Sequence, residues 1–305
     1  MAKKKTATDA KKKKARKQAS KPVARKPAPP GEFKITKRNA MAGLKLTGPS
    51  SVNLVATDPP WGIEWPGYGD FADDLVGAEY VKWCQRWMSL VYSVLKPNGT
   101  FFLAIGPEYV SELDMVAKSL GFHKQAQITQ YSTFGVHCQR NYARTSSYWL
   151  WYTKHKTKYT FNAGPPGPDP ETLVPSARLI KYNDKRAAKG GKAPENVWVL
   201  HPDHMKQFYS GREDVWLASR IAGTFKEREF RGKTGEKQTC PQMPLAVMDR
   251  IVLTHSNAGD KVLDPFTGTG TTAVSAVSNG RHFQGFELDA SRAKSSRARV
   301  RKALK

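Results

Sequence analysis

A short segment, NLVATDPPWGI at residues 53–63, combines residue types that suit chemistry at the end of a β-strand. An apolar run is followed directly by the acid Asp58, by Pro59 and Pro60, and by the aromatic ring of Trp61. Neither proline has a backbone N–H, so a strand must stop there. One interpretation is a rigid turn. The functional one is a site where Asp58 and a fixed backbone carbonyl face a ligand and Trp61 stacks on it.

A second segment, DKVLDPFTGTGTT at residues 260–272, has the pattern of a strand, a glycine turn and a helix start. Gly268 and Gly270 allow positive φ and close approach of the backbone to a ligand. The amides at Thr271 and the next residue would supply donors and the positive end of a helix dipole. No lysine follows the second glycine, which excludes a phosphate-binding P-loop. A hydride-transferring Rossmann enzyme is disfavoured, because its fingerprint has a third glycine.

An acid, Glu287, ends the next apolar run, QGFELD, about 20 residues after the glycine turn. A carboxylate at this position can bind the two hydroxyls of a ribose, as in dinucleotide-binding folds. A glycine turn alone is often only a turn, and a single acid is often only solvated. The spacing to Glu287 and the presence of DPPW together favour a ligand site.

The elements around these segments follow an α/β pattern. Apolar runs predict strands at 51–57, 100–106 and 146–154, and amphipathic spacing predicts helices at 78–95 and 109–121. After an irregular stretch the pattern resumes with a helix at 245–256, a strand at 261–266, a helix at 271–280, a strand at 282–289 and a basic helix to 305. We therefore expect a parallel-type sheet covered by helices.

The charge is concentrated at the N-terminus. Residues 1–38 hold 15 Lys and Arg against only two acids, out of a net charge of +24. This Lys/Ala/Pro-rich stretch has no apolar periodicity and is expected to be disordered. Polyanions, above all nucleic acid, are the natural partners of such a chain. The tail itself is either solubilising or a sequence-blind DNA tether that works through phosphate contacts.

Other features exclude several classes of protein. No run of about 18 apolar residues predicts a transmembrane helix, and the N-terminus has no apolar core typical of a secretory signal. Cys84, Cys138 and Cys240 are far apart and form no C-x-x-C pair. Neither a metal site nor a disulfide framework is expected, and a reducing compartment is favoured.

The two segments, in this order, resemble the S-adenosylmethionine-dependent amino-methyltransferases of DNA. LDPFTGTGTT followed by GFELD resembles their methyl-donor pocket, and TDPPW resembles their catalytic tetrapeptide. The catalytic tetrapeptide comes first, then a variable region, then the donor pocket, which is the order of the β group. The resemblance covers about residues 45–300. CPQMPLAVMDRIV resembles the segment upstream of the donor pocket, which usually reads Gln-Lys-Pro, with Met243 in place of the lysine.

The resemblance implies a Rossmann-like methyltransferase sheet flanked by helices, with an inserted variable target-recognition region and a disordered basic N-terminal tail. The implied units are the tail at 1–38, a catalytic half at 39–155, the target-recognition region at 156–240 and a donor-binding half at 241–305. It implies catalytic roles for Asp58, Pro59, Pro60 and Trp61, and contacts to S-adenosyl-L-methionine by Asp264, Phe266, Gly268, Gly270, Thr271, Glu287 and Gln242. No metal is implied.

The residue types of the tetrapeptide suit this chemistry. An exocyclic base amine is a poor nucleophile, because its lone pair is delocalised into the ring. Asp58 can accept one amine hydrogen and the carbonyl of Pro59 the other, which favours a pyramidal nitrogen whose lone pair points at the methyl donor. Trp61 would stack on the base, which must first leave the duplex.

Several functions remain open at this point. Adenine N6 is the favoured target, because Asp at the first tetrapeptide position is typical of adenine enzymes, and cytosine N4 is the alternative. An RNA adenine methyltransferase and a catalytically inactive DNA-binding protein are further alternatives. Double-stranded DNA is the expected partner, with a homodimer as one option. We expect a bacterial or phage-encoded cytoplasmic enzyme of a restriction-modification system or a lone methylase.

Overall fold

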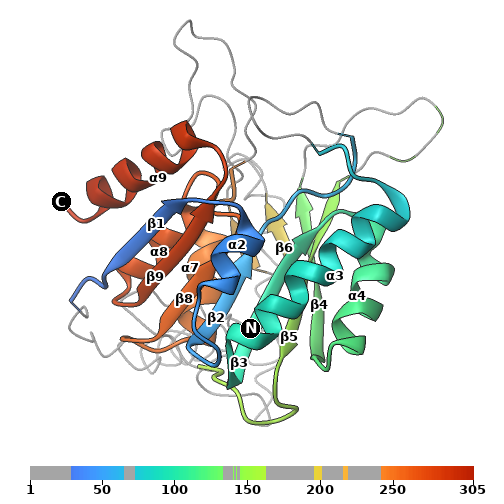
Figure 1. The fold of residues 1–305 in the computed structure, drawn as a ribbon, viewed down its shortest axis with the longest axis horizontal. Helices are drawn as coiled ribbons and strands as arrows, with labels where there is room; N and C mark the ends of the chain where they lie inside the picture. Colours follow the sequence, from blue (N-terminus) through green and yellow to red (C-terminus); the bar gives the residue numbers. More distant parts are fainter. Residues whose placement is uncertain are drawn as a thin grey trace, which may run out of the picture.

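The computed structural model describes residues 29–64, 73–132, 140, 142, 145–162, 196–200, 216–218 and 242–305. Within these residues the chain forms a single mixed sheet with helices on both faces (Figure 1). The strands are β1 Phe33–Lys37, β2 Val52–Thr57, β3 Leu95–Ile105, β4 His123–Ser132, β5 Ser146–Thr153, β6 Val197–Leu200, β7 Trp216–Ala218, β8 Lys261–Asp264 and β9 His282–Glu287. Their order in the sheet is β1-β9-β8-β2-β3-β5-β4-β6-β7.

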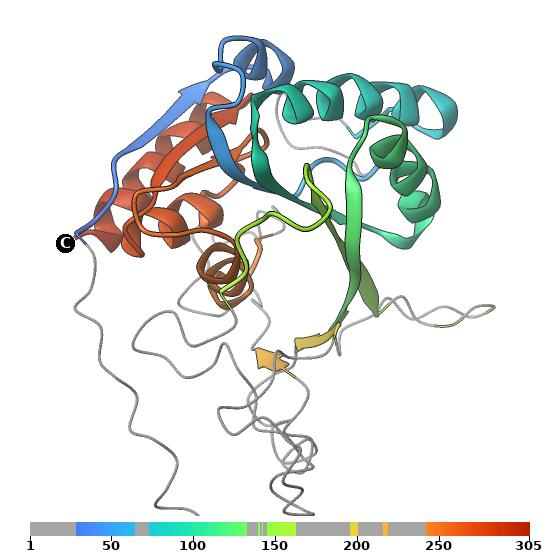
Figure 2. The same cartoon turned by 90° about the horizontal axis from the view of Figure 1, so that it is seen from below.

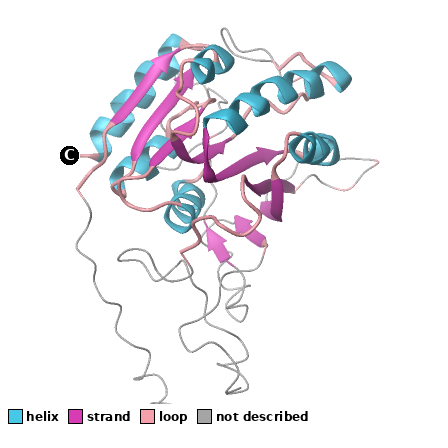
Figure 3. Ribbon diagram, turned by 60° about the horizontal axis from the view of Figure 1, so that its bottom comes forward, coloured by secondary structure: helices cyan, strands magenta, loops and turns pink. Residues whose placement is uncertain are grey.

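Two groups of helices cover the two faces of the sheet (Figures 2 and 3). The first group is α2 Ala40–Lys45, α3 Gly77–Val94 and α4 Val110–Ser119, with the 3-10 turn η1 Pro107–Tyr109 before α4. The second is α7 Leu245–His255, α8 Thr271–Ser278 and α9 Ala290–Ala303. Side chains alternate between the faces along each strand, so Leu54 and Ala56 of β2 face the second group and Val55 faces the first.

The strand order reverses between the neighbouring strands β8 and β2. From β8 the chain continues to β9 on one side, whereas from β2 it continues to β3 on the other. In open α/β sheets, ligands bind at the carboxyl ends of the strands at such a switch point. Here those ends are Thr57 and Asp264, which lie 207 positions apart in the chain and share a hydrogen bond. The fold therefore brings the two sequence segments together.

The Rossmann-like sheet predicted from the sequence is confirmed, with two corrections. The predicted parallel sheet is mixed, because β5 runs antiparallel to both β3 and β4. Strand β4 was not predicted, since most of its residues are polar (HKQAQITQYS) and hide the apolar alternation. The KPNG sequence at 96–99 follows the end of α3 at Val94 and lies inside β3, at a register shift against β2.

The basic tail predicted at 1–38 is too long at its C-terminal end. Residues 33–37 form β1, which pairs in parallel with β9, and the Arg38 amide donates to the Glu287 carbonyl at 2.9 Å. Of β1 only Ile35 is buried, so this short edge strand carries too weak an apolar signal to be recognised. Residues 1–28 lie outside the described residues, and their disorder stays a prediction.

Part of the region predicted as variable, 156–240, adds to the sheet. Strands β6 and β7 continue it beyond β4. The first residues of the region pack on the core: the Phe161 ring stacks on Trp151 at 5.6 Å, and the Asn162 side-chain amide donates to the Leu253 carbonyl at 2.9 Å. The other residues of the region lie outside the described part, and its boundaries and recognition role stay predictions.

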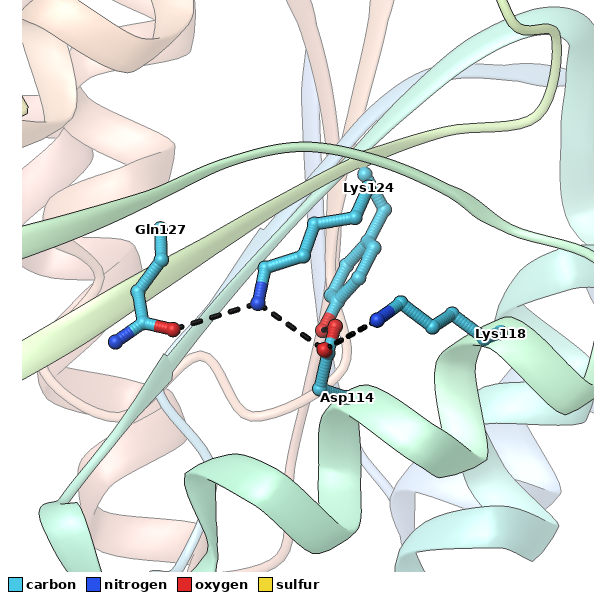
Figure 4. Close-up of polar contacts among 5 residues, drawn as sticks. Asp114, Lys118, Lys124 and Gln127 are labelled. Carbon is cyan, nitrogen blue, oxygen red and sulfur yellow. Dashed lines mark hydrogen bonds and ion pairs between the residues drawn. The ribbon is translucent and has the colours of Figure 1, made fainter.

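A polar cluster fastens α4 to the sheet (Figure 4). The Asp114 carboxylate accepts from Lys118 at 2.7 Å and forms an ion pair with Lys124 at 3.1 Å. Lys124 also donates to Gln127 at 3.3 Å, and the Tyr152 hydroxyl of β5 donates to Asp114 at 2.9 Å. These opposite charges hold the pKa of Asp114 below its usual range despite partial burial.

No helix in the described ranges is long and apolar enough to cross a membrane. Of the three cysteines, Cys84 is a buried free thiol in α3. Burial raises its pKa to about 12, so it stays a protonated core residue. The other two, Cys138 and Cys240, lie outside the described residues.

Two deletions separate the charge of the tail from the fold. Removal of residues 1–28 should leave the melting temperature unchanged and make the salt dependence of DNA binding shallower, by about 0.9 in logarithmic slope for each lost phosphate contact. Removal of residues 1–38 should also lower the melting temperature, because β1 and the buried Ile35 are lost, at about 2 kcal/mol for that side chain alone. Equal melting temperatures for the two deletions would contradict a structural role for β1.

Candidate active site

The tetrapeptide DPPW turns back on itself at the end of β2. Asp58 is half-buried, and the indole N–H of Trp61 donates to its Oδ1 at 3.0 Å. The Trp61 ring lies against Gly106, directly after β3, where an added Cβ would come within 2.9 Å of the ring. A side chain at Gly106 would therefore displace the indole from Asp58.

Because the two prolines have no backbone N–H, their carbonyl oxygens are their only polar groups in this turn. The Tyr80 hydroxyl of α3 donates to the Pro60 carbonyl at 2.7 Å. Among the residues that the structure describes, no hydrogen bond reaches the Pro59 carbonyl. The Pro59 carbonyl and the second oxygen of Asp58 are thus available as acceptors at the same strand end.

Asp264, at the end of β8, links the tetrapeptide to the glycine turn. Its Oδ1 accepts from Thr57 at 2.6 Å and from the Phe266 amide at 3.0 Å, and its Oδ2 accepts from Thr272 at 2.8 Å. Thr57 immediately precedes Asp58, and Thr272 lies in the first turn of α8. Through these three hydrogen bonds Asp264 links the two halves of the site. The contact to S-adenosyl-L-methionine that the resemblance implies for Asp264 stays a prediction.

The electrostatics of the two strand-end acids are unusual. Burial, with the neighbouring Asp264 adding to it, raises the pKa of Asp58 to about 7, although the Trp61 hydrogen bond opposes the shift. Burial likewise raises the pKa of Asp264 to about 6, against the opposing hydrogen bonds of Thr57 and Thr272. Both groups bind protons more tightly in the folded state, so their contribution to stability is lost as the pH rises through these values.

The two glycines of the turn do different things. Gly268 has φ +50°, and an added Cβ there would meet only the Phe266 carbonyl oxygen, at 3.8 Å. Its amide donates to Glu287 Oε2 at 2.8 Å. Gly270 has φ +79° and begins α8, and an added Cβ would lie only 3.0 Å from the Ser296 Cβ of α9. Gly268 therefore leaves room for a ligand, whereas Gly270 permits close packing of α9.

Two side chains of helix α9 form hydrogen bonds with the glycine turn, which the sequence did not indicate. The Ser296 hydroxyl donates to the Gly268 carbonyl. The buried Arg299 donates to the Thr269 carbonyl at 3.2 Å and to the Thr271 hydroxyl at 2.8 Å. In the sequence both residues belong to a basic helix, and nothing in their spacing distinguishes them from solvated positions.

Glu287 closes the site on the β9 side. Its Oε1 accepts from the Asp289 amide at 3.0 Å, so each oxygen already holds one backbone N–H. An ionised carboxylate has about four lone-pair sites, which leaves capacity for two ribose hydroxyls. Burial raises the pKa of Glu287, and these amide bonds oppose the shift.

The remaining predicted residues flank the turn. The half-buried Phe266 ring packs against Trp83 and Trp87 of α3, with centroid distances of 5.5 and 5.3 Å. Gln242 lies just before α7 and is half-buried. Helix α7 contacts the turn through the Met248 sulfur, which lies 3.7 Å from the Thr272 hydroxyl oxygen. A role for Gln242 in donor binding stays a prediction.

The sequence is similar to known DNA methylases. Residues 52–298 match the family described as DNA methylase (N6_N4_Mtase). The chain is 31% identical over 234 residues to the type II methyltransferase M.HpaI of Haemophilus parainfluenzae. The aligned region covers 76% of this chain and 63% of M.HpaI. It is 28% identical over 257 residues to the DNA adenine methyltransferase YhdJ of Escherichia coli K12, covering 82% and 76% of the two chains. The chain thus spans less than two thirds of M.HpaI.

Solved structures show the same fold. The PvuII DNA methyltransferase (cytosine-N4-specific) has a TM-score of 0.59 at 15% identity, covering 92% of this chain and 94% of the other. The M1.HpyAVI complex with SAM has a TM-score of 0.53 at 18% identity, covering 88% and 98%. The chain belongs to the DNA methylase family of S-adenosylmethionine-dependent amino-methyltransferases.

Substitutions in the glycine turn test the donor pocket. Gly268→Val should weaken S-adenosylmethionine binding, because the valine would project into the little-obstructed space that a ligand needs and is strained at φ +50°. Glu287→Ala should weaken it by about 1–3 kcal/mol, because ribose hydroxyls lose their partner. Gly259→Val is the matched control: its φ is +83°, it also has open space, and it precedes β8 at the opposite end of the strand. Calorimetric donor affinity reduced equally in all three variants would contradict the assignment.

The hydrogen bond from Trp61 predicts a shift in the pH profile. Protonated Asp58 is a donor and ionised Asp58 an acceptor, so kcat/KM for DNA should rise with pH through about 7. Trp61→Phe keeps an aromatic face but removes the bond that lowers the Asp58 pKa, and the midpoint should move to higher pH. The same midpoint in both proteins would show that Asp58 does not govern the profile.

Proposed function

We propose that this chain transfers the methyl group of S-adenosyl-L-methionine to the N6 amine of a flipped adenine in double-stranded DNA. The observation that carries the proposal is the joint at the switch point, where the 2.6 Å hydrogen bond from Thr57 to Asp264 sets the tetrapeptide beside the glycine turn. The strand end that we assign to catalysis and the strand end that we assign to nucleoside binding thus share one edge of the sheet.

The residues around the turn suit the methyl donor. Glu287 would bind the ribose hydroxyls of S-adenosyl-L-methionine, and the exposed side of Phe266 would contact its adenine ring. The amides at the start of α8 near Thr271 would face its carboxylate. Gly268 leaves the space that the nucleoside needs. The donor supplies an electrophilic methyl group on a sulfonium sulfur.

The tetrapeptide orients the amine. The Asp58 oxygen that Trp61 leaves unbonded would accept one amine hydrogen, and the Pro59 carbonyl would accept the other. This arrangement directs the nitrogen lone pair away from the ring and toward the donor. As the N–C bond forms and the S–C bond breaks, the amine loses one proton, for which Asp58, with a pKa of about 7, is a suitable acceptor before solvent. Orientation of this kind is worth at most about 7–11 kcal/mol.

Two arguments favour adenine. The relative YhdJ is named a DNA adenine methyltransferase and is 28% identical over 82% of this chain. Asp58 at the first tetrapeptide position is typical of adenine enzymes. Cytosine N4 is the alternative target. The PvuII enzyme is named as cytosine-N4-specific, but the similarity to it, at 15% identity, concerns the fold. RNA is disfavoured as the substrate, because relatives such as YhdJ are named as methyltransferases of DNA. A catalytically inactive protein is disfavoured, because Asp58, Gly268 and Glu287 are all present.

Mass spectrometry of nucleosides from duplex DNA incubated with the protein and S-adenosylmethionine tests the proposal. N6-methyladenine is expected, and N4-methylcytosine would establish the alternative. Asp58→Ala should fold and bind the donor, yet lower the single-turnover rate by a factor of about 10²–10³, because an acceptor aimed at developing charge is lost. Asp58→Asn keeps an acceptor oxygen and should retain partial activity. Full activity of Asp58→Ala would overturn the mechanism, and absence of both methylated bases with the wild-type protein would overturn the function.

A further inference from the structure

The tetrapeptide cannot be held in place by its own proline amides. Pro59 and Pro60 have no N–H, so the sheet-type hydrogen bonds that anchor a strand end are missing where accuracy matters most. Besides the bond from Trp61 to Asp58, an anchor can come from a donor directed at a proline carbonyl or from an acceptor for the amides that follow Trp61. The structure contains one of each, and the sequence pattern indicated neither.

The donor is Tyr80, in the first turns of α3. Its hydroxyl lies 2.7 Å from the Pro60 carbonyl oxygen, and the side chain is 1% exposed. Its ring packs on Tyr109 at 4.6 Å and fills the space beside Gly62, where an added Cβ would lie 2.7 Å from the ring. Burial raises the Tyr80 pKa far above its usual range, so the hydroxyl remains a donor at every working pH.

The acceptor is Asp73. Its Oδ1 accepts from the Gly62 amide at 2.7 Å and its Oδ2 accepts from the Ile63 amide at 3.2 Å. The side chain is 5% exposed, and both oxygens are directed at the backbone just after the tetrapeptide. A buried carboxylate is costly without such partners, so these two bonds fix the Gly62 backbone firmly.

We propose that Tyr80 and Asp73 are positioning residues that set the direction of the tetrapeptide's carbonyls for catalysis. Tyr80 turns the Pro60 carbonyl toward α3, and Asp73 fixes the following amides, so the chain between Asp58 and Gly62 is pinned at its C-terminal end. This restraint would hold the Pro59 carbonyl in the direction that amine orientation needs. This inference rests on the proposed function, because it assigns the pinning to amine orientation.

The effect of losing these anchors should appear in the chemical step and not in donor binding. The donor pocket is built from β8, β9, α8 and α9, and neither Tyr80 nor Asp73 contributes a hydrogen bond to it. A displacement of about 1 Å in a catalytic acceptor can lower a rate by about 10²-fold. Tyr80→Phe removes only the hydroxyl and keeps the ring that packs on Gly62 and Tyr109.

The experiment compares single-turnover methylation of duplex DNA by wild type, Tyr80→Phe and Tyr152→Phe. Tyr152 is a matched control: it is a buried tyrosine whose hydroxyl donates to Asp114 at 2.9 Å, on β5, separated from β2 by β3. We expect Tyr80→Phe to lower the rate about 10- to 100-fold with donor affinity within twofold of wild type, and Tyr152→Phe to leave both unchanged. The plateau of the Tyr80→Phe pH profile should fall while its midpoint stays in place, unlike that of Trp61→Phe.

A second variant keeps the inference testable if Tyr80→Phe is unstable. Asp73→Asn replaces one acceptor oxygen by an NH2 group, which cannot accept from the backbone, and it should also lower the rate with methyl-donor affinity retained. Rates of Tyr80→Phe and Asp73→Asn equal to that of Tyr152→Phe, or reduced only in proportion to the folded fraction, would overturn the inference. A wild-type protein that forms no methylated base would instead overturn the proposed function.

Discussion

The hydrogen bond between Thr57 and Asp264 is the contact on which the site depends. Only two residue pairs, Leu54–Val262 and Val55–Leu263, form the ladder between β2 and β8. The 2.6 Å side-chain bond extends this short pairing to the ends of both strands, where the DPPW segment and the glycine turn meet. The same carboxylate also fixes the Phe266 amide and the first turn of α8. One buried acid therefore connects the strand, the turn and the helix by hydrogen bonds. Without these hydrogen-bond donors, its ionised form would be an uncompensated charge in the core.

Ionisation of the two acids at this edge of the sheet lowers the stability of the fold. Asp58 and Asp264 lie in surroundings that favour the protonated form, with pKa values near 7 and 6. Near neutral pH a substantial fraction is ionised, which costs free energy in the ligand-free protein. A cationic sulfonium nearby would lower that cost by Coulombic attraction. The arrangement suits a site that is completed electrostatically when the donor binds, as strained or poorly solvated active sites often are.

The sequence was sufficient for the elements with strong apolar runs and for the two motifs. β2, β8 and β9 are buried strands whose patterns are unambiguous, and glycine or proline marks the end of β2 and β8. What it could not supply depends on contacts between distant residues. Tyr80 fits the apolar stripe of α3, and only the fold shows that its hydroxyl meets Pro60. Asp73 and Arg299 are acids and bases in ordinary-looking contexts, whereas β1 and β4 are strands whose polar residues obscure the alternation.

The order of the segments along the chain has a consequence for synthesis on the ribosome. β2 emerges early and can pair with β3 at once, but its other neighbour, β8, follows only after some two hundred residues, as the 207-position separation of Thr57 and Asp264 shows. Until then the apolar strand VNLVAT is an open sheet edge, which is a template for unwanted pairing. Long-range strand pairing is also slow to form. The nascent protein is therefore most vulnerable to aggregation in the interval before its last helices appear, and chaperone binding should be strongest there.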